Sequence, residues 1–182
     1  MELIKTDISG LVIIKPRVFE DDRGYFYESF KQEWFDEHVG TTNFVQDNQS
    51  LSGKGILRGL HFQKEPFAQG KLVRVIKGAV LDVAVDIRVG SPTYGKHRSI
   101  ELSERNHLQF YVPSGFAHGF LTLEEQTIFS YKCTNIYNKE SEGGLIYNDE
   151  SLGIDWGITN PKLSNKDKDY LAFKDFKSPF KY

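Results

Sequence analysis

Cysteine is almost absent from this sequence of 182 residues, which contains one, Cys133. A single cysteine excludes a disulfide within the chain and any metal site built from several cysteines. Such sparing use of cysteine is compatible with a reducing compartment, and we expect a cytoplasmic protein.

The sequence also lacks a strong charge of one sign and long apolar runs. Lys and Arg number 23 against 25 Asp and Glu, for a formal net charge of -2, and no basic run stands out. We therefore expect no binding to nucleic acid. The opening residues MELIKTDISG lack the apolar core of a signal peptide, and no window approaches about 18 consecutive apolar residues. We expect neither a signal peptide nor a membrane association.

Short strand-like runs fill most of the chain, with no repeat, linker or low-complexity segment between them. Aromatic residues make up 14% of the sequence, a content that suits strands. The expected helices cover residues 31–39 and a short piece within 165–173. Expected strands lie within residues 11–19, 25–30, 71–78, 79–88, 97–103, 106–113 and 127–137. The pattern predicts one domain over residues 1–182, mainly β, folded as a jelly-roll-like barrel with few short helices.

The run VLDVAVDIR shows the alternation most clearly. Leu81, Val83 and Val85 share one face of the expected strand, whereas Asp82 and Ala84 share the other. One apolar and one polar face are typical of an antiparallel sheet folded over a core.

The stretch GILRGLHFQ carries two ionisable side chains in an apolar segment. An unpaired charge is costly to bury, so Arg58 and His61 are either satisfied structural residues or line a cavity. Strict alternation places them on opposite faces of a strand. A bulge at Gly59 would bring Arg58 to the same face as His61. Other polar residues in the expected strands are Gln63, Lys71, Arg74, Asp82, His118 and Tyr131.

The segment PSGFAHGF delivers His118 from a turn to the start of a strand. Its pattern P-x-G-x-x-H resembles the second motif of the cupin superfamily of double-stranded β-barrels, many of which bind a metal. In the corresponding first motif, HFQKE, Gln63 stands where a second histidine ligand belongs. Because an amide oxygen is a poor ligand for a soft divalent metal, we expect no metal and no other cofactor.

The remaining groups suit acid–base chemistry without a metal. His61 titrates near neutrality and can act as a base, Tyr131 can donate a proton, and Lys71 can stabilise an oxyanion. Together they suit proton abstraction next to a carbonyl. Taken singly, each has a structural interpretation: Tyr131 as a strand aromatic, Lys71 as a solvated edge residue, and His118 as a satisfied turn residue.

At these residues the sequence resembles the dTDP-4-dehydrorhamnose 3,5-epimerases, which are cupin-like enzymes of dTDP-L-rhamnose biosynthesis. The similarity covers nearly the whole chain in order. Its segments are DDRGYFYESF, QDNQSLSGKGILRGLHFQ, AQGKLVRVIKGAVLDVAVDIR, SPTYG, GFAHGF, YNDESLGIDW and LSNKD.

The resemblance implies roles for individual residues. His61 would be the base that removes protons beside the C4 ketone, and Asp167 would pair with it. Tyr131 would return a proton on the opposite face, and Lys71 would stabilise the enolate. The residues implied to hold the sugar nucleotide are Arg23, Glu28, Gln46, Asn48, Arg58, His118, Tyr137, Glu142 and Lys166. Within that set, Arg23 and Arg58 would contact the diphosphate, and Tyr137 would stack on thymine. The resemblance also implies a homodimer in which N-terminal strands pair.

Three departures from the family pattern keep alternatives open. Glu65 and Phe67 replace an expected proline- or histidine-rich turn, SEGG carries a glycine where a basic residue is common, and Asp169 is a second candidate for the partner of His61. The main alternative is an epimerase that acts on only C3 or only C5 of another dTDP-4-keto-6-deoxy sugar. Less favoured alternatives are a metal-dependent cupin oxygenase and a non-catalytic sugar-nucleotide-binding barrel.

Overall fold

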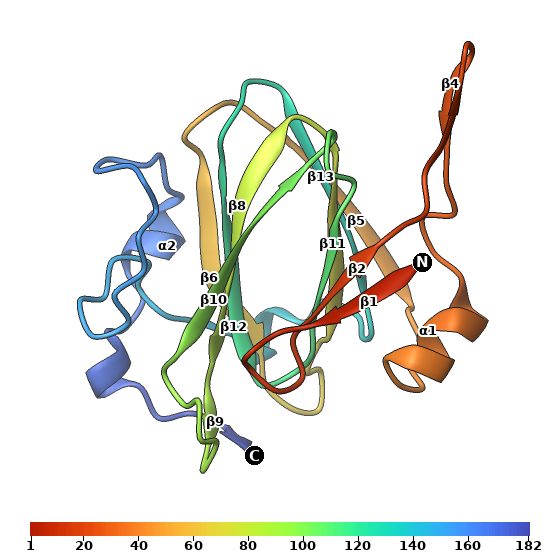
Figure 1. Cartoon of the computed structure of the whole chain (residues 1–182). Helices are drawn as coiled ribbons and strands as arrows, with labels where there is room; N and C mark the ends of the chain where they lie inside the picture. The colour runs from red at the N-terminus through yellow and green to blue at the C-terminus, as the bar shows by residue number, and fades with distance from the viewer.

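Two antiparallel sheets face each other in the structure, a computed structural model that describes all 182 residues (Figure 1). The six-stranded sheet has the order β1 (Glu2–Lys5), β2 (Val12–Lys15), β11 (Gln109–Val112), β7 (Lys71–Lys77), β13 (Thr127–Cys133) and β5 (Gln46–Ser52). The five-stranded sheet has the order β10 (His97–Ser103), β8 (Ala79–Asp86), β12 (Phe116–Thr122), β6 (Leu57–Gln63) and β14 (Glu142–Gly144). The expected jelly-roll barrel, mainly β, is confirmed.

The remaining elements are short and lie outside the two sheets. They are the hairpin β3 (Phe19–Asp21) and β4 (Gly24–Phe26), the parallel pair β9 (Arg88–Val89) and β15 (Phe180–Lys181), the helices α1 (Gln32–His38) and α2 (Asn165–Lys168), and the 3-10 helices η1 (Lys139–Ser141) and η2 (Phe173–Asp175). The helix expected over residues 31–39 is present, whereas only four residues of the expected 165–173 piece are α-helical. None of the helices is long and apolar enough to cross a membrane.

The central strands of the five-stranded sheet, β8 and β12, are buried on both faces. The inner face of this sheet packs with the six-stranded sheet in an apolar cluster that includes Val80, Phe120 and Phe129. Its outer face is covered by the C-terminal segment, through residues such as Leu145 and Trp156. Figure 1 shows this segment and α2 lying along β6.

The polar face expected for the β8 run is therefore not directed to solvent. Asp82 and Ala84 are fully buried and face the barrel interior, whereas Val83 and Val85 pack under the C-terminal segment. The alternation was predicted correctly, but its interpretation as one core face and one polar outer face was wrong. Both faces are buried because the C-terminal segment supplies a second apolar layer.

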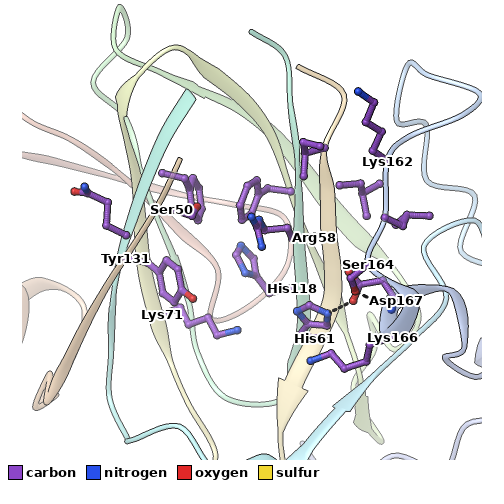
Figure 2. Close-up of a pocket in the computed structure, with 16 residues that line it drawn as sticks. Ser50, Arg58, His61, Lys71, His118, Tyr131, Lys162, Ser164, Lys166 and Asp167 are labelled. Carbon is purple, nitrogen blue, oxygen red and sulfur yellow. Dashed lines mark hydrogen bonds and ion pairs between the residues drawn. The ribbon is translucent and has the colours of Figure 1, made fainter. Parts of the chain in front are cut away.

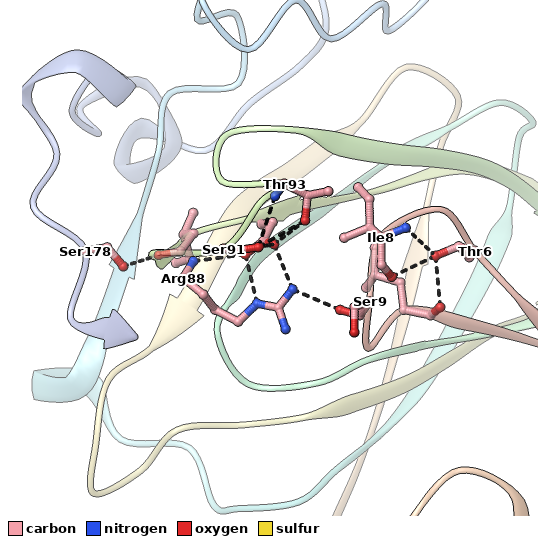
Figure 3. A network of polar contacts seen from close by, with 10 residues as sticks. Thr6, Ile8, Ser9, Arg88, Ser91, Thr93 and Ser178 are labelled. Atoms are coloured by element: carbon pink, nitrogen blue, oxygen red, sulfur yellow. Dashed lines mark hydrogen bonds and ion pairs between the residues drawn. The ribbon is translucent and has the colours of Figure 1, made fainter. Parts of the chain in front are cut away.

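A charged cluster at the end of β8 lies between the N-terminal segment around Ser9 and the C-terminal segment around Ser178 (Figure 3). The Arg88 guanidinium donates to the Asp86 carboxylate from Nε at 2.9 Å and from Nη2 at 2.7 Å, and Nη2 also donates to the carbonyl of Ser9. Burial opposes ionisation of Asp86, but hydrogen bonds from Arg88 and neighbouring hydroxyls outweigh it, so the pKa of this carboxyl is lowered. The guanidinium also lies 4.9 Å from the ring centre of Tyr182.

Candidate active site

A cavity of about 700 Å³ opens between the inward faces of the two sheets. Figure 2 shows polar side chains converging on it from both sheets and from α2. Its lining includes Arg58, His61, Lys71, His118, Tyr131 and Asp167, all of them residues singled out from the sequence. A space of this size is in the usual range for small-molecule sites.

Arg58 and His61 face this cavity together because β6 bulges between them. On the neighbouring strand β12, His118 pairs with His61 and Phe120 pairs with Arg58, so three residue steps on β6 match two on β12. The extra residue lies at Gly59, whose φ of +135° favours glycine. A Cβ there would lie 2.4 Å from the Cα of Gly119, so no side chain fits. The bulge predicted at Gly59 is confirmed.

His61 is paired with Asp167, which arrives from α2 at the other end of the sequence. The His61 Nε2 lies 2.5 Å from the Asp167 Oδ1, and their side chains are 24% and 3% exposed. Ser164 caps α2 by accepting from the Asp167 amide. Burial raises the pKa of Asp167, but the hydrogen bond and charge of His61 outweigh it and lower that pKa. Asp169, the second candidate, is exposed, and the hydrogen bond of His61 goes to Asp167 instead.

His118 forms a second, deeper pair on the same sheet. Its Nε2 lies 2.8 Å from the Asp82 Oδ1 and 3.0 Å from Oδ2, and both residues are buried. His118 therefore lies within β12 and not in a turn, and Asp82 satisfies its ring. No group of three or more His, Cys, Asp or Glu side chains is arranged to hold a metal ion. Gln63 is fully engaged as well, because its amide bonds the backbone of Phe67, Ile136 and Asn138.

Lys71 and Tyr131 approach from the six-stranded sheet, across the cavity from His61 (Figure 2). Burial lowers the pKa of Lys71, and the charges of Cys133, Asp82 and Glu142 partly offset this effect. Burial raises the pKa of Tyr131 above its ordinary value of about 10, so its phenol holds its proton at neutral pH.

Several of the expected substrate-binding residues form a linked set that meets the cavity lining at Lys166. Glu142 accepts from the Tyr137 hydroxyl at 3.0 Å and from the Lys166 ammonium at 2.6 Å. Gln46 accepts from the Tyr137 amide at 2.9 Å and donates to Asn48. Tyr137 is 54% exposed, which leaves its ring free to stack on a flat ligand.

Arg23 and Glu28 are the expected residues that belong neither to the cavity lining nor to this linked set. Arg23 sits in the β3–β4 hairpin, which projects away from the barrel (Figure 1). Its side chain is 89% exposed and pairs with Asp21 of the same hairpin. Glu28 is also exposed.

The structure adds Tyr170 to the site, a residue that sequence reasoning missed. Its ring meets the His61 ring edge-on, with centres 5.6 Å apart. It packs where a side chain at Gly144 would otherwise stand, so the second glycine of SEGG makes room for it. Burial and the nearby Glu142 carboxylate raise the pKa of Tyr170 to about 12. The glycine pair was the only sequence signal, and it did not indicate what would fill the space.

Comparison with known proteins places this geometry in a family. The family model for dTDP-4-dehydrorhamnose 3,5-epimerase matches residues 5–175. The chain is 52% identical over 176 residues to the enzyme of that name from Shigella flexneri, covering 96% of this chain and 97% of the relative.

Two solved structures show the same fold. A dTDP-6-deoxy-D-glucose-3,5-epimerase from Legionella pneumophila, solved with dTDP-4-keto-L-rhamnose, superposes with a TM-score of 0.95 at 46% identity, covering 100% of this chain and 98% of that one. A 3'-monoepimerase from Streptomyces bikiniensis gives 0.89 at 30% identity, covering 94% and 87%. The chain belongs to the dTDP-4-dehydrorhamnose 3,5-epimerase family.

Proposed function

We propose that the chain inverts C3 and C5 of dTDP-4-dehydro-6-deoxy-D-glucose to give dTDP-4-dehydro-L-rhamnose. The observation that carries this proposal is the His61–Asp167 pair, which shares one cavity with Lys71 and Tyr131. These groups supply a base, a cation for the enolate and an acid. The similarity is also higher to the Shigella 3,5-epimerase, at 52% identity, than to the monoepimerase, at 30%.

His61 begins each inversion by removing a proton from a carbon next to the C4 ketone. Because its Nε2 bonds Asp167, Nδ1 is the ring nitrogen left to accept that proton. The Asp167 carboxylate then stabilises the imidazolium. The electron pair of the broken C–H bond moves into the C3–C4 or C4–C5 bond, and the ketone oxygen becomes an enolate beside the Lys71 ammonium.

Tyr131 completes the inversion by donating its phenolic proton to the opposite face of the same carbon. The raised pKa of Tyr131 keeps this proton available at neutral pH. One proton leaves to His61 and one arrives from Tyr131, so the substrate gains and loses no atoms. Solvent restores both residues before the second carbon reacts.

The other residues are proposed to bind the sugar nucleotide. Tyr137 stacks on thymine, while Glu142, Lys166, Gln46 and Asn48 bind at the cavity edge. Arg58 has one hydrogen-bond partner in the protein, Ser52 at 3.3 Å, so its remaining donors are free for the diphosphate. His118, held by Asp82, presents its ring to the substrate from the cavity wall.

We propose that two copies of the chain complete each other's sites. The β3–β4 hairpin exposes Phe19, Tyr25 and Phe26, which are 52%, 57% and 68% exposed. It also carries Arg23, which its own cavity does not use. Docking of this hairpin on a second copy would bury the aromatic rings and bring Arg23 and Glu28 to the partner's cavity.

Mixing two inactive variants tests this arrangement. A pool of Arg23→Ala and His61→Asn chains, refolded together, should recover roughly a quarter of wild-type activity, because only mixed dimers hold one intact site. If Arg23 acted in its own cavity, no mixed dimer would have an intact site and no activity would return. Each variant refolded alone is the control.

We also propose that residues 1–182 act as one domain, in the cytoplasm and without a metal or organic cofactor. The first part is supported by a site that draws on both sheets and on α2. The donor set supports the absence of a metal, because Gln63 and His118 are engaged by protein partners. Dialysis against EDTA should leave activity unchanged; a loss that one specific divalent metal reverses would overturn this proposal.

The most direct test of the function is the reaction itself. Purified protein incubated with dTDP-4-dehydro-6-deoxy-D-glucose should yield the L-rhamno product, identified by its proton NMR couplings. Recovery of substrate inverted at one carbon alone would instead identify a monoepimerase.

A further inference from the structure

The imidazole of His61 is held by a hydrogen bond at one atom, which leaves the plane of its ring to be fixed by packing. Its Nε2 bonds the Asp167 Oδ1 at 2.5 Å. The torsion that turns a histidine ring about its Cβ–Cγ bond has broad minima. Because Nε2 lies close to the axis of that rotation, a bond to Nε2 restrains the rotation only weakly. A second contact is needed to fix the direction of Nδ1, the atom proposed to accept the substrate's proton.

Tyr170 supplies such a contact from the place of a missing side chain. The residue paired with His61 on β14 is Gly144, which leaves space on that side of the imidazole. A Cβ at Gly144 would lie 2.5 Å from the Tyr170 Cε2 and 2.6 Å from its Cζ, so the tyrosine ring fills this space. The Tyr170 and His61 rings have centres 5.6 Å apart and planes at 66°, a favoured edge-to-face arrangement.

The segment that carries Tyr170 also carries Asp167, and it is attached to the sheet at both of its ends. Backbone hydrogen bonds of 2.8 and 2.9 Å join Lys162 to the residues around the start of β6. Another, of 3.0 Å, joins Leu171 to the residues that follow β14. One anchored segment therefore brings a carboxylate to Nε2 of His61 and an aromatic ring to the side of its imidazole.

Tyr170 is not placed to react with a substrate itself. It does not belong to the lining of the cavity, which His61 and Asp167 do line. Burial and the nearby Glu142 carboxylate raise the pKa of Tyr170 to about 12, so its phenol is uncharged at neutral pH. Any part that Tyr170 takes in the reaction therefore acts through His61.

We propose that Tyr170 is a positioning residue, whose ring holds the His61 imidazole in the plane that directs Nδ1 into the cavity. This inference rests on the proposed function, in which His61 is the base. The lone pair of Nδ1 lies in the plane of the ring, so a rotation turns it away from the C–H bond even while Asp167 stays bonded. A misaligned catalytic group slows the chemical step and leaves binding of the substrate largely intact.

Two substitutions separate the ring of Tyr170 from its hydroxyl. In Tyr170→Ala, kcat should fall roughly 10- to 100-fold with KM nearly unchanged, because the substrate binds beside a misaligned base. Tyr170→Phe keeps the ring and should retain a kcat close to that of the wild type. Wild-type kcat in the Ala variant, or a raised KM as its only change, would overturn the proposal. A Phe variant as slow as the Ala variant would also overturn it, because the hydroxyl would then be the group that matters.

Phe173→Ala is the matched control in the same C-terminal segment. The Phe173 ring packs on Tyr94, with centres 5.1 Å apart, and does not belong to the cavity lining. Loss of this ring should lower Tm and leave kcat unchanged. A fall in kcat as large as that of Tyr170→Ala would show that any loosening of the segment slows the reaction, and it would contradict a specific role for Tyr170.

A crystal structure of Tyr170→Ala without substrate gives a readout that does not depend on activity. The His61 ring should be rotated or occupy two planes, while its Nε2 remains bonded to Asp167. A single ring plane, unchanged from the wild type, would overturn the positioning role and leave the proposed function standing. A wild-type protein that inverts neither carbon, together with a rotated ring in the variant, would remove the function and leave the positioning role.

Discussion

The cavity contains two histidine–carboxylate pairs on neighbouring strands, and their surroundings differ. His61 is 24% exposed and its carboxylate, Asp167, arrives from a short helix 106 residues later. His118 is 7% exposed, and its carboxylate, Asp82, lies on the adjacent strand of the same sheet. We call His61–Asp167 the open pair and His118–Asp82 the closed pair. A base must reach the substrate and change its charge, which the exposure of the open pair permits. The closed pair holds a ring in a fixed place, as binding requires.

Replacing the imidazole ring of each pair in turn should give the largest difference in activity between the two pairs. His61→Asn should abolish both deuterium incorporation and inversion at C3 and C5, because no enolate forms without the base. His118→Asn, the matched variant of the closed pair, should mainly raise KM and retain measurable exchange. NMR of the substrate in D₂O measures both quantities. Inversion at the wild-type rate in the His61 variant would overturn the base assignment.

Loss of the proposed proton donor, Tyr131, should separate deuterium exchange from inversion of the carbon. In Tyr131→Phe, His61 can still remove a proton and return a deuteron to the same face, so exchange should survive. Inversion should fall by roughly 10²–10⁴-fold, the usual effect of losing a general acid. Equal loss of exchange and inversion in this variant would show that Tyr131 does not act only as the proton donor.

The next test compares the two carboxylates that could pair with His61, Asp167 in α2 and Asp169 directly after it. Asp167→Asn removes the charge that stabilises the His61 imidazolium, and kcat should fall by roughly 100-fold. Asp169→Asn is the control, because Asp169 is exposed and lies outside the pair. It should retain wild-type kinetics. A comparable loss in both variants would indicate that the effect comes from α2 as a whole.

The smallest expected effect is a shift in the pH profile. In the proposed mechanism Lys71 stabilises the enolate only while it is protonated, and burial lowers its pKa. Activity should therefore fall as pH rises through a value below that of an ordinary lysine. Lys71→Arg keeps the positive charge at higher pH, so the alkaline fall should move upward even if kcat is reduced. An unchanged alkaline limb in this variant would remove Lys71 as its source.

Much of this site could be predicted because its residues stand in short local patterns. The glycine at position 59 predicted the bulge that brings Arg58 to the face of His61, and the structure confirms it. The family resemblance supplied Asp167, whose distance from His61 in the sequence no local pattern bridges.

Other features depended on long-range packing and could not be predicted. The alternation of β8 was visible, but only the C-terminal segment decides that its polar face is the barrel interior. For the same reason the pairing of Asp82 with His118 was missed, and so was the contact of Tyr170 with His61. The projection of Arg23 away from its own cavity follows from the path of a hairpin, which residue types alone do not specify.

The most direct test of the central claim is proton NMR of dTDP-4-dehydro-6-deoxy-D-glucose with wild-type protein in D₂O. The open pair at His61 predicts that deuterium replaces the protons at both C3 and C5 while the L-rhamno product accumulates, and that His61→Asn shows neither change. Exchange at one carbon only, or no exchange with the wild-type protein, would contradict the account.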